Sequence, residues 1–225
     1  MLQSTDLPSE IPVMSLNGVV LFPYGVLPLF IFEPRYRQML TETLEGDRIF
    51  GIATLNPEST EEENGEPIFP IVGVGYIKIQ RTNSDGTSNL ILEGFCRARV
   101  KSILREEPYR VLAVEPIHSI QTANEPAVKK LRLHIVQKLT SLRQYGYDVP
   151  QKILRFLEDK SDEVFAFMVA NTWCECLTER IDLLGEPDVT QLYIRLNAIL
   201  TRELKNRSMF QKLQGDLDED NISLN

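Results

Sequence analysis

The spacing of apolar residues changes once along the chain, near residue 120. Before that point, apolar residues alternate with polar ones or form short blocks bounded by turn residues, as in β-strands. After it, they recur every three or four residues, as in amphipathic helices. The sequence therefore predicts a β region over residues 1–120, a helical region over 121–210 and an acidic, disordered tail over 211–225.

Five segments of the β region have the clearest strand pattern. Residues 83–86 (NSDG) form a strong hairpin signal between the second and third. In the fourth, Arg97, Arg99 and Lys101 alternate with Ala98 and Val100, which predicts one face in water and one in the core. The predicted strands cover residues 49–54, 71–80, 88–94, 96–104 and 109–117.

Helix signals follow in the second region. Pro126 suits the first turn of a long helix that ends before Gly146, and Ser161 is a suitable N-cap for a later one. We expect helices from Pro126 to before Gly146, around 153–157, from Ser161 to about Cys174, over 178–184, and from about Asp188.

The stretch LPLFIFEPRYRQML, residues 27–40, passes from an apolar block directly into charged residues. Pro34 suits the first position of a helix because its φ is fixed near the helical value and it has no backbone donor. Glu33 then lies at the positive end of the helix dipole. Apolar residues continue at helical spacing as far as Gly46, so the charges mark a junction between a strand and a helix.

Several motifs, in a consistent order, resemble those of one known family. VVLFPYGVLPLFIFEPRYRQML, LILEGFCRARV, PYRVLAVE and the helical ending from DEVFAFMVANTW to LYIRLNAIL resemble the N-terminal, substrate-binding domain of Lon proteases. The resemblance covers roughly residues 11–204. It implies an α+β fold, with a PUA-like β pseudo-barrel followed by an all-α helical bundle.

The resemblance also implies a non-catalytic domain that binds unfolded polypeptides or a protein partner, in protein quality control or proteolysis. A full Lon protease adds an ATPase and a peptidase domain, and a phosphate-binding loop requires a Gly-Lys pair. No glycine of this chain precedes a lysine, and no length remains for a peptidase domain. We therefore expect a free-standing domain that is not an enzyme and needs no cofactor. An RNA-binding module is the alternative, since PUA-like folds elsewhere bind RNA.

The net charge of −8 is shared unequally, with −6 on residues 1–120 (10 Lys+Arg, 16 Asp+Glu) and −2 on 121–225 (14 and 16). Neither part has the basic surplus that phosphate groups attract, so nucleic acid and anionic membranes are disfavoured partners. The chain has no apolar run of about 20 residues, as a bilayer span needs, and its first residues carry no export signal. We expect a cytoplasmic protein.

Candidate groups for chemistry are few. Cys174 and Cys176 are one residue apart, but the residues that could complete a metal site, Cys96, His118 and His134, are scattered, so we expect no metal. Either histidine could act as a general base in a small hydrolase, a third hypothesis, although a structural role is favoured.

Two further motifs have structural readings. Gly73 and Gly75 lack the third glycine of a dinucleotide-binding loop, so they are interpreted as relief of crowding in a strand. The neighbouring carboxylates Glu106 and Glu107 are interpreted as structural as well.

Surface groups remain as candidates for partner binding. Arg35 and Arg37 lie in the first turn of the helix after Pro34, where the dipole disfavours cations, which makes them candidates for a contact with a partner. The alternative to a partner contact is pairing within the chain, for instance with Glu33 or Asp47. Tyr24 is the aromatic candidate, with simple packing as its alternative. The predicted partner-binding residues are Tyr24, Glu33, Arg35 and Arg37.

Overall fold

The structure is a computed structural model that describes residues 6–59, 67–145 and 159–220. Its contacts divide the chain into two compact units. The first contains Met1–Ser119 and Phe167–Pro187, and the second contains Ile120–Ala166 and Asp188–Asn225. The sequence pattern predicted a single change near residue 120. In the structure, residues 167–187 return to the unit that contains the strands.

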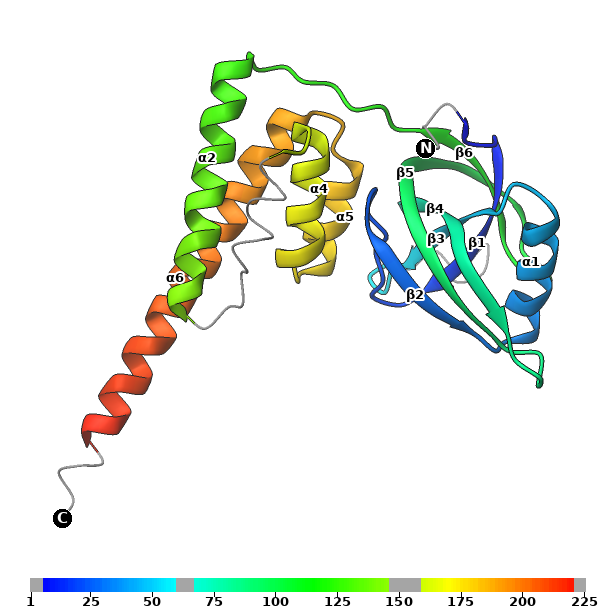
Figure 1. Ribbon diagram of the computed structural model, residues 1–225, viewed down its shortest axis with the longest axis horizontal. Coiled ribbons are helices and arrows are strands. Elements are labelled where there is room, and N and C mark those ends of the chain that lie inside the picture. Colours follow the sequence, from blue (N-terminus) through cyan, green and yellow to red (C-terminus); the bar gives the residue numbers. More distant parts are fainter. Residues whose placement is uncertain (1–5, 60–66, 146–158, 221–225) are drawn as a thin grey trace. The chain divides into compact units, whose positions relative to one another are not determined.

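The first unit is built on a six-stranded sheet in the part of the chain that the structure describes, with strand order β2-β5-β4-β3-β1-β6. An additional pairing of β5 with β6 closes five of these strands into a barrel, and β2 adds to the open half of β5 (Figure 1). The strands are β1 (Glu10–Leu16), β2 (Val26–Ile31), β3 (Ile49–Leu55), β4 (Ile68–Thr82), β5 (Ser88–Arg105) and β6 (Val111–Pro116). The predicted α+β fold with a β pseudo-barrel is confirmed.

Two details of the strand prediction were wrong. The segments 88–94 and 96–104 form one strand, β5, whose pairing with β4 shifts register between Val74 and Gly75. Strand β1 was missed because Pro12 interrupts its pattern. Pro12 is tolerated because only one of its sides is paired. It lies opposite Val111 of β6, whereas the pairing of β1 with β3 begins at Val13, so Pro12 needs no N–H toward β3.

Helix α1 (Pro34–Glu45) covers one part of the barrel core. Its buried residues Tyr36, Met39 and Leu40 pack with side chains of β1 to β5, such as Phe50 and Leu92. The Tyr36 hydroxyl also donates to the backbone oxygen of Ser15 at 3.3 Å. The helix predicted after Pro34 is therefore confirmed, and its apolar face fixes it to the sheet.

The segment before β2, residues 19–25, is a loop whose apolar residues are largely buried. Leu21 and Phe22 lie in the interior, and their backbone crosses the sheet at two glycines. A Cβ atom on Gly73 would lie 1.8 Å from the Leu21 oxygen, and one on Gly94 would lie 2.2 Å from the Phe22 oxygen. The reading of Gly73 as a site of close backbone approach is confirmed.

Arg97 corrects the prediction of a solvated face on the second half of β5, because it is only 2% exposed. Its guanidinium donates to the oxygens of Leu184 (2.7 Å) and Glu186 (2.6 Å) and to the Ser119 hydroxyl (2.9 Å). The carbonyls at the C-terminal end of α5 (Leu177–Gly185) carry the negative end of the helix dipole. Arg97 therefore ties α5 to β5, which explains why residues 167–187 belong to this unit.

A second arginine strengthens the same contact. Arg180 of α5 donates to the oxygens of Cys174 (2.9 Å) and Val20 (3.2 Å), and it lies over the Phe22 ring at 5.1 Å. Phe22 in turn packs against Phe167, with 6.0 Å between ring centroids. We call this region, formed by Phe22, Arg97, Phe167 and Arg180, the α5 junction.

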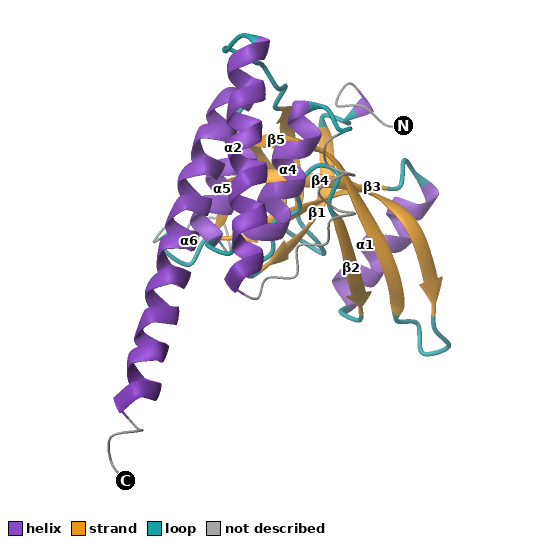
Figure 2. Ribbon diagram, turned by 60° about the vertical axis from the view of Figure 1, so that its left-hand side comes forward, coloured by secondary structure: helices purple, strands orange, loops and turns teal. Residues whose placement is uncertain are grey.

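The second unit is helical. Helices α2 (Glu125–Leu142) and α6 (Val189–Asp220) lie side by side, η2 (Arg143–Tyr145) follows α2, and α4 (Asp162–Trp173) contributes its first residues (Figures 1 and 2). Asp162 joins all three helices, since Arg132 of α2 and Tyr193 of α6 both donate to it. The predicted helices that begin near Pro126, Ser161, Thr178 and Asp188 are confirmed.

Two parts of the helix prediction have other outcomes. The helix expected around residues 153–157 lies outside the described residues. Helix α6 continues to Asp220 through most of the segment predicted as a disordered tail, and residues 221–225 are again outside the description.

Candidate functional site

Tyr24 occupies a tight turn at the start of β2. Its φ is +64°, its N–H donates to the Gly94 oxygen at 2.8 Å, and its side chain is 43% exposed. The turn is therefore fixed to β5 by its backbone. The tyrosine ring is left partly open to solvent, as a partner contact requires.

Glu33 and Arg35 flank Pro34 at the start of α1. The Arg35 Nε donates to Glu33 at 2.9 Å, and the guanidinium also lies over the Tyr36 ring at 4.6 Å. Intramolecular pairing with Glu33, one of the two readings of Arg35, is therefore present. Asp47, the other suggested partner, lies just after the opposite end of α1 and lines a separate cleft of about 240 Å³.

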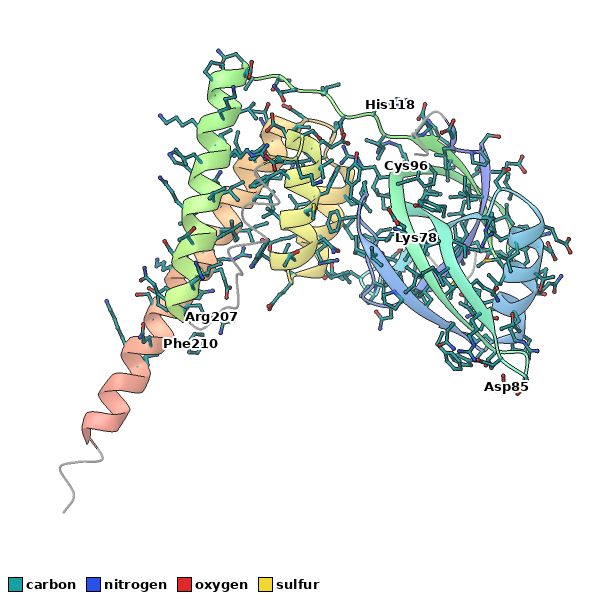
Figure 3. All side chains as sticks on the ribbon, in the orientation of Figure 1. Lys78, Asp85, Cys96, His118, Arg207 and Phe210 are labelled. Carbon is teal, nitrogen blue, oxygen red and sulfur yellow. The ribbon has the colours of Figure 1, made fainter. Side chains whose placement is uncertain are left out.

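Arg37 lies beside the turn that joins β4 and β5. A Cβ atom on Gly86 would lie 1.9 Å from a guanidinium nitrogen of Arg37, so the side chain rests against bare backbone. Asp85, at the tip of this hairpin (Figure 3), accepts bonds from the Thr87 hydroxyl and N–H, which lower its pKa, and the Arg37 charge adds to that effect. Among the described residues, the Arg37 guanidinium makes no ion pair.

The structure does not bring the four predicted residues together. Tyr24 precedes β2, whereas Glu33, Arg35 and Arg37 follow it. A strand of six residues is about 20 Å long, so they form two separate places at opposite ends of β2.

The side of β2 between these places carries the residues that the sequence did not single out. Val26, Phe30 and Phe32 are 56%, 54% and 60% exposed, and the rings of Phe30 and Phe32 stack with centroids 6.0 Å apart. Strand register extends this surface sideways, because Pro28 pairs with Ile91 of β5 and Ile91 pairs with the exposed Ile79 of β4. We call Tyr24, Val26, Pro28, Phe30, Phe32, Ile79 and Ile91 the outer face.

Alternation along β2 explains this arrangement. Leu27, Leu29 and Ile31 pack against the core under α1, so the residues between them must point away from it. The strand pairs with β5 on one side, and within the described residues no other strand pairs with it. The sequence signal was ambiguous, because an unbroken apolar run is also typical of a strand buried on both faces.

Charged groups lie beside the apolar residues. Lys78, which lies within an irregularity of the β4–β5 pairing, makes an ion pair with Glu93, and this contact raises the Lys78 pKa. Arg81 is exposed on the side of β4 opposite the half-buried Gln80. The outer face is thus an exposed apolar row on β2 that continues to Ile91 and Ile79, with Glu93 and Asn89 of β5 opposite Val26 and Phe30 and with cations at its border. An exposed apolar area rimmed by polar residues is typical of an interaction surface.

The groups considered for chemistry lie apart. His118 is exposed after β6 (Figure 3), His134 is exposed on α2, and neither lines the cleft beside Asp47. Among the residues that the structure describes, no group of three or more His, Cys, Asp or Glu side chains could hold a metal. Glu106 makes an ion pair with the buried Arg110 at 2.9 Å, which is a structural contact.

Comparison with known proteins places these features in a family. Residues 10–202 match the family model described as the ATP-dependent protease La (LON) substrate-binding domain. The chain is 23% identical to Lon protease 1 of Herpetosiphon aurantiacus, with 97% of the chain and 27% of the relative covered. It is 25% identical to Lon protease 2 of Bdellovibrio bacteriovorus, with 89% and 25% covered. It therefore spans about a quarter of the length of these relatives.

Solved structures show the same fold. The N-terminal domain of Mycobacterium avium complex Lon protease aligns with a TM-score of 0.66 at 14% identity, covering 85% of this chain and 98% of that one. A Lon N-terminal domain protein from Xanthomonas campestris aligns with a TM-score of 0.59 at 18% identity and the same coverage. In the described part of the chain, no helix is both long and apolar enough to span a bilayer.

Proposed function

Because the chain belongs to the family of the ATP-dependent protease La (LON) substrate-binding domain, we propose that it binds unfolded polypeptides on the outer face and catalyses no reaction itself. The observation that carries the proposal is the exposed row of Val26, Pro28, Phe30 and Phe32 on β2. Unfolded proteins expose the apolar side chains that folded proteins bury. A solvent-exposed apolar surface on this chain would therefore bind unfolded proteins in preference to folded ones.

The architecture supports this role. The outer face lies on paired strands, so its side chains are held in place before a ligand arrives, which lowers the entropy cost of binding. Pro28 has no N–H to offer at the β2 edge, which disfavours recognition by strand addition alone. Recognition through side chains tolerates many sequences, as binding of unfolded proteins requires. The overall charge of −8 continues to disfavour the RNA-binding alternative.

The test measures, by fluorescence anisotropy, how tightly the wild-type chain and its variants bind a permanently unfolded, fluorescently labelled polypeptide. We expect the double variant Phe30→Ser/Phe32→Ser to weaken binding by at least about tenfold, because two large apolar contacts are lost. The matched control is Leu104→Ser, which removes an apolar side chain that is 48% exposed from the other half of β5. Equal affinity of the double variant and the wild type would contradict the proposed surface.

The absence of catalysis has its own assay. The purified chain should neither hydrolyse ATP nor degrade an unfolded protein such as casein. ATP-dependent proteolysis by this chain alone would contradict the proposal. A labelled RNA in the same titration tests the alternative, which a salt-sensitive complex would favour.

A further inference from the structure

A cleft of about 470 Å³ lies on the side of the β4–β5 hairpin opposite the outer face. One wall is α1, which contributes Pro34, Leu40 and Leu44 as apolar groups. The other wall is the hairpin, which contributes Gln80, Thr82 and Ser88. Alternation along β4 separates the two surfaces, since Gln80 and Thr82 line the cleft while Ile79 and Arg81 point away from it. We call this space the α1 cleft.

The polar groups of the α1 cleft mostly bond to one another. The Gln80 amide donates to the hydroxyls of Thr82 (2.5 Å) and Ser88 (3.3 Å). Gln38 donates to Glu42, and the Thr41 hydroxyl donates to the Arg37 backbone oxygen. These donors are therefore engaged within the chain. The Gln80 amide oxygen, for which the structure shows no donor among the described residues, offers an acceptor on the hairpin wall.

Arg37 is the only cationic side chain among the described residues that line the α1 cleft. Its guanidinium makes no ion pair there, although it is held in place against the backbone of Gly86. Gly86 has φ +80°, so the turn both favours glycine and leaves room for the arginine. Asp85 lies near enough for the Arg37 charge to lower its pKa, but its carboxylate accepts from Thr87 and makes no ion pair with Arg37. The Arg37 guanidinium can therefore receive another carboxylate in two parallel hydrogen bonds.

We propose that the α1 cleft binds the C-terminal end of a polypeptide, with its carboxylate on Arg37 and its last apolar side chain against Leu40 and Leu44. Arg37, Leu40 and Leu44 lie on one side of α1, at spacings of three and four residues. A ligand must therefore carry its charge and its apolar group close together. A chain end does so because both groups are attached to one Cα atom, whereas an internal acidic residue has its apolar neighbour on a different Cα.

This inference rests on the proposed function and narrows its substrate class to chains with an apolar C-terminal residue. The size of the cleft agrees with one or two residues, so it adds an end-specific contact to the unspecific apolar contact on the outer face. Binding at two places on one chain raises the overall affinity through effective concentration.

The test uses N-terminally labelled hexapeptides that end in Leu-Leu, in anisotropy titrations against the purified chain. One peptide has a free C-terminal carboxylate, the second is the C-terminal amide, and the third is an amide with an internal glutamate. We expect the free acid to bind at least about tenfold more tightly than either amide, because a charge-assisted bidentate contact is lost in both. Equal binding of acid and amide, or tight binding of the glutamate peptide, would overturn the proposal.

Variants assign the effect to the cleft. Arg37→Gln should reduce the affinity for the acid to that for the amide, while Thr41→Trp should weaken both by filling the space. The matched control is Arg81→Gln, which removes an exposed arginine from the other side of the same hairpin and should leave the ratio of acid to amide unchanged. A ratio that persists in Arg37→Gln, or that is lost in Arg81→Gln, would contradict the assignment. Thermal unfolding checks that each variant is folded.

The two proposals fail in different ways. If acid and amide bind alike while Phe30→Ser/Phe32→Ser loses the unfolded polypeptide, the outer face stands and the end-specific cleft falls. If no polypeptide or peptide binds, both fall.

Discussion

The α5 junction and the outer face use the same types of residue, aromatic rings and arginines, in opposite ways. At the junction, Phe22 and Phe167 are fully buried and the Arg97 guanidinium is surrounded by carbonyl oxygens of its own chain. On the outer face, Phe30 and Phe32 stack on each other in solvent. Side chains whose contacts are complete within the fold serve stability, and those left open are available for binding.

The same contrast separates two arginines of the first unit. Arg97 offsets the cost of burial with several hydrogen bonds and with the Phe167 ring, 4.6 Å from its guanidinium. Arg37 is exposed and lies beside a cleft. Residue type and charge alone do not distinguish them, so the distinction must be tested by replacing each.

The largest effect should come from Phe22→Ala. Phe22 is 0% exposed, and its replacement leaves a cavity against Phe167 and Arg180, so we expect the free energy of unfolding to fall by about 3–5 kcal/mol. Phe30→Ala removes the same atoms from an exposed position and should change the free energy of unfolding by no more than about 0.5 kcal/mol. Urea unfolding followed by circular dichroism measures both.

The milder variant Phe22→Leu keeps the comparison measurable if Phe22→Ala does not fold. Phe22→Leu should still lower the free energy of unfolding clearly more than Phe30→Ala does. Equal losses at the two positions would mean that the outer face is part of the core in solution, and the contrast between the regions would fail.

The next largest effect should come from Arg97→Met, which keeps most of the side-chain volume but leaves the α5 carbonyls without a donor. We expect a loss of about 3 kcal/mol, since buried acceptors that lose a charged donor retain their desolvation cost. The control is Arg99→Met, because Arg99 is exposed on the same strand and should contribute within about 0.5 kcal/mol. Similar urea midpoints for the two variants would contradict a structural role of Arg97.

Arg97 also shows where sequence reasoning reached its limit. Alternation of Arg97, Arg99 and Lys101 predicted a solvated face, and Arg99 and Lys101 are exposed. Arg97 differs because its partners, Leu184 and Glu186, are 87 and 89 residues away along the chain. Periodicity reports which residues share a face of one strand, but not which distant helix end covers part of that face.

The order of elements could be predicted because each depends on local signals. Pro34 and Pro126 at helix starts, and the turn at residues 83–86, gave boundaries close to those observed. The candidate site was predicted only in part. Arg37 was identified, but the α1 cleft depends on the meeting of α1 with the hairpin, and the outer face depends on β2 lying at a sheet edge. Both are properties of tertiary packing.

A smaller effect is expected in the helical unit, at Asp188. Its buried carboxylate accepts hydrogen bonds from its own chain, so it belongs with the side chains whose contacts are complete within the fold. Burial alone would raise its pKa, but hydrogen bonds from Thr122 and Thr190 outweigh burial, so the pKa lies below its ordinary value. A lowered pKa in the folded state adds stability at pH values above about 4, the ordinary pKa of aspartate, and this contribution is lost as the pH falls through the folded value.

Asp188→Asn should therefore cost about 1 kcal/mol at pH 7, and the difference from the wild type should shrink at pH 3. Urea unfolding at the two pH values measures it. The control is Asp182→Asn on the exposed side of α5, which should change the free energy of unfolding by no more than about 0.5 kcal/mol. A difference that grows as the pH falls would contradict the sign of the shift.

The smallest perturbation is chemical labelling of the three cysteines, which requires no substitution at the junction. Burial raises the pKa of Cys96 to about 12 and that of Cys174 to about 11, whereas the Thr178 hydroxyl and the Glu179 N–H lower the pKa of the exposed Cys176. At pH 8 a maleimide should therefore label one thiol per folded chain quickly, and Cys176→Ser should remove this fast phase.

The slow labelling of Cys96 then measures how often the barrel beside Arg97 opens, because the buried thiol reacts only from an opened state. A loss of about 3 kcal/mol in Arg97→Met corresponds to roughly a 100-fold faster reaction, since each 1.4 kcal/mol is a factor of ten. Phe30→Ser should leave the rate unchanged, because the outer face is already open in the native state. Mass spectrometry of labelled peptides assigns each rate to its cysteine. If Cys96 reacted as fast as Cys176 in the wild type, the junction would be no more closed than the outer face.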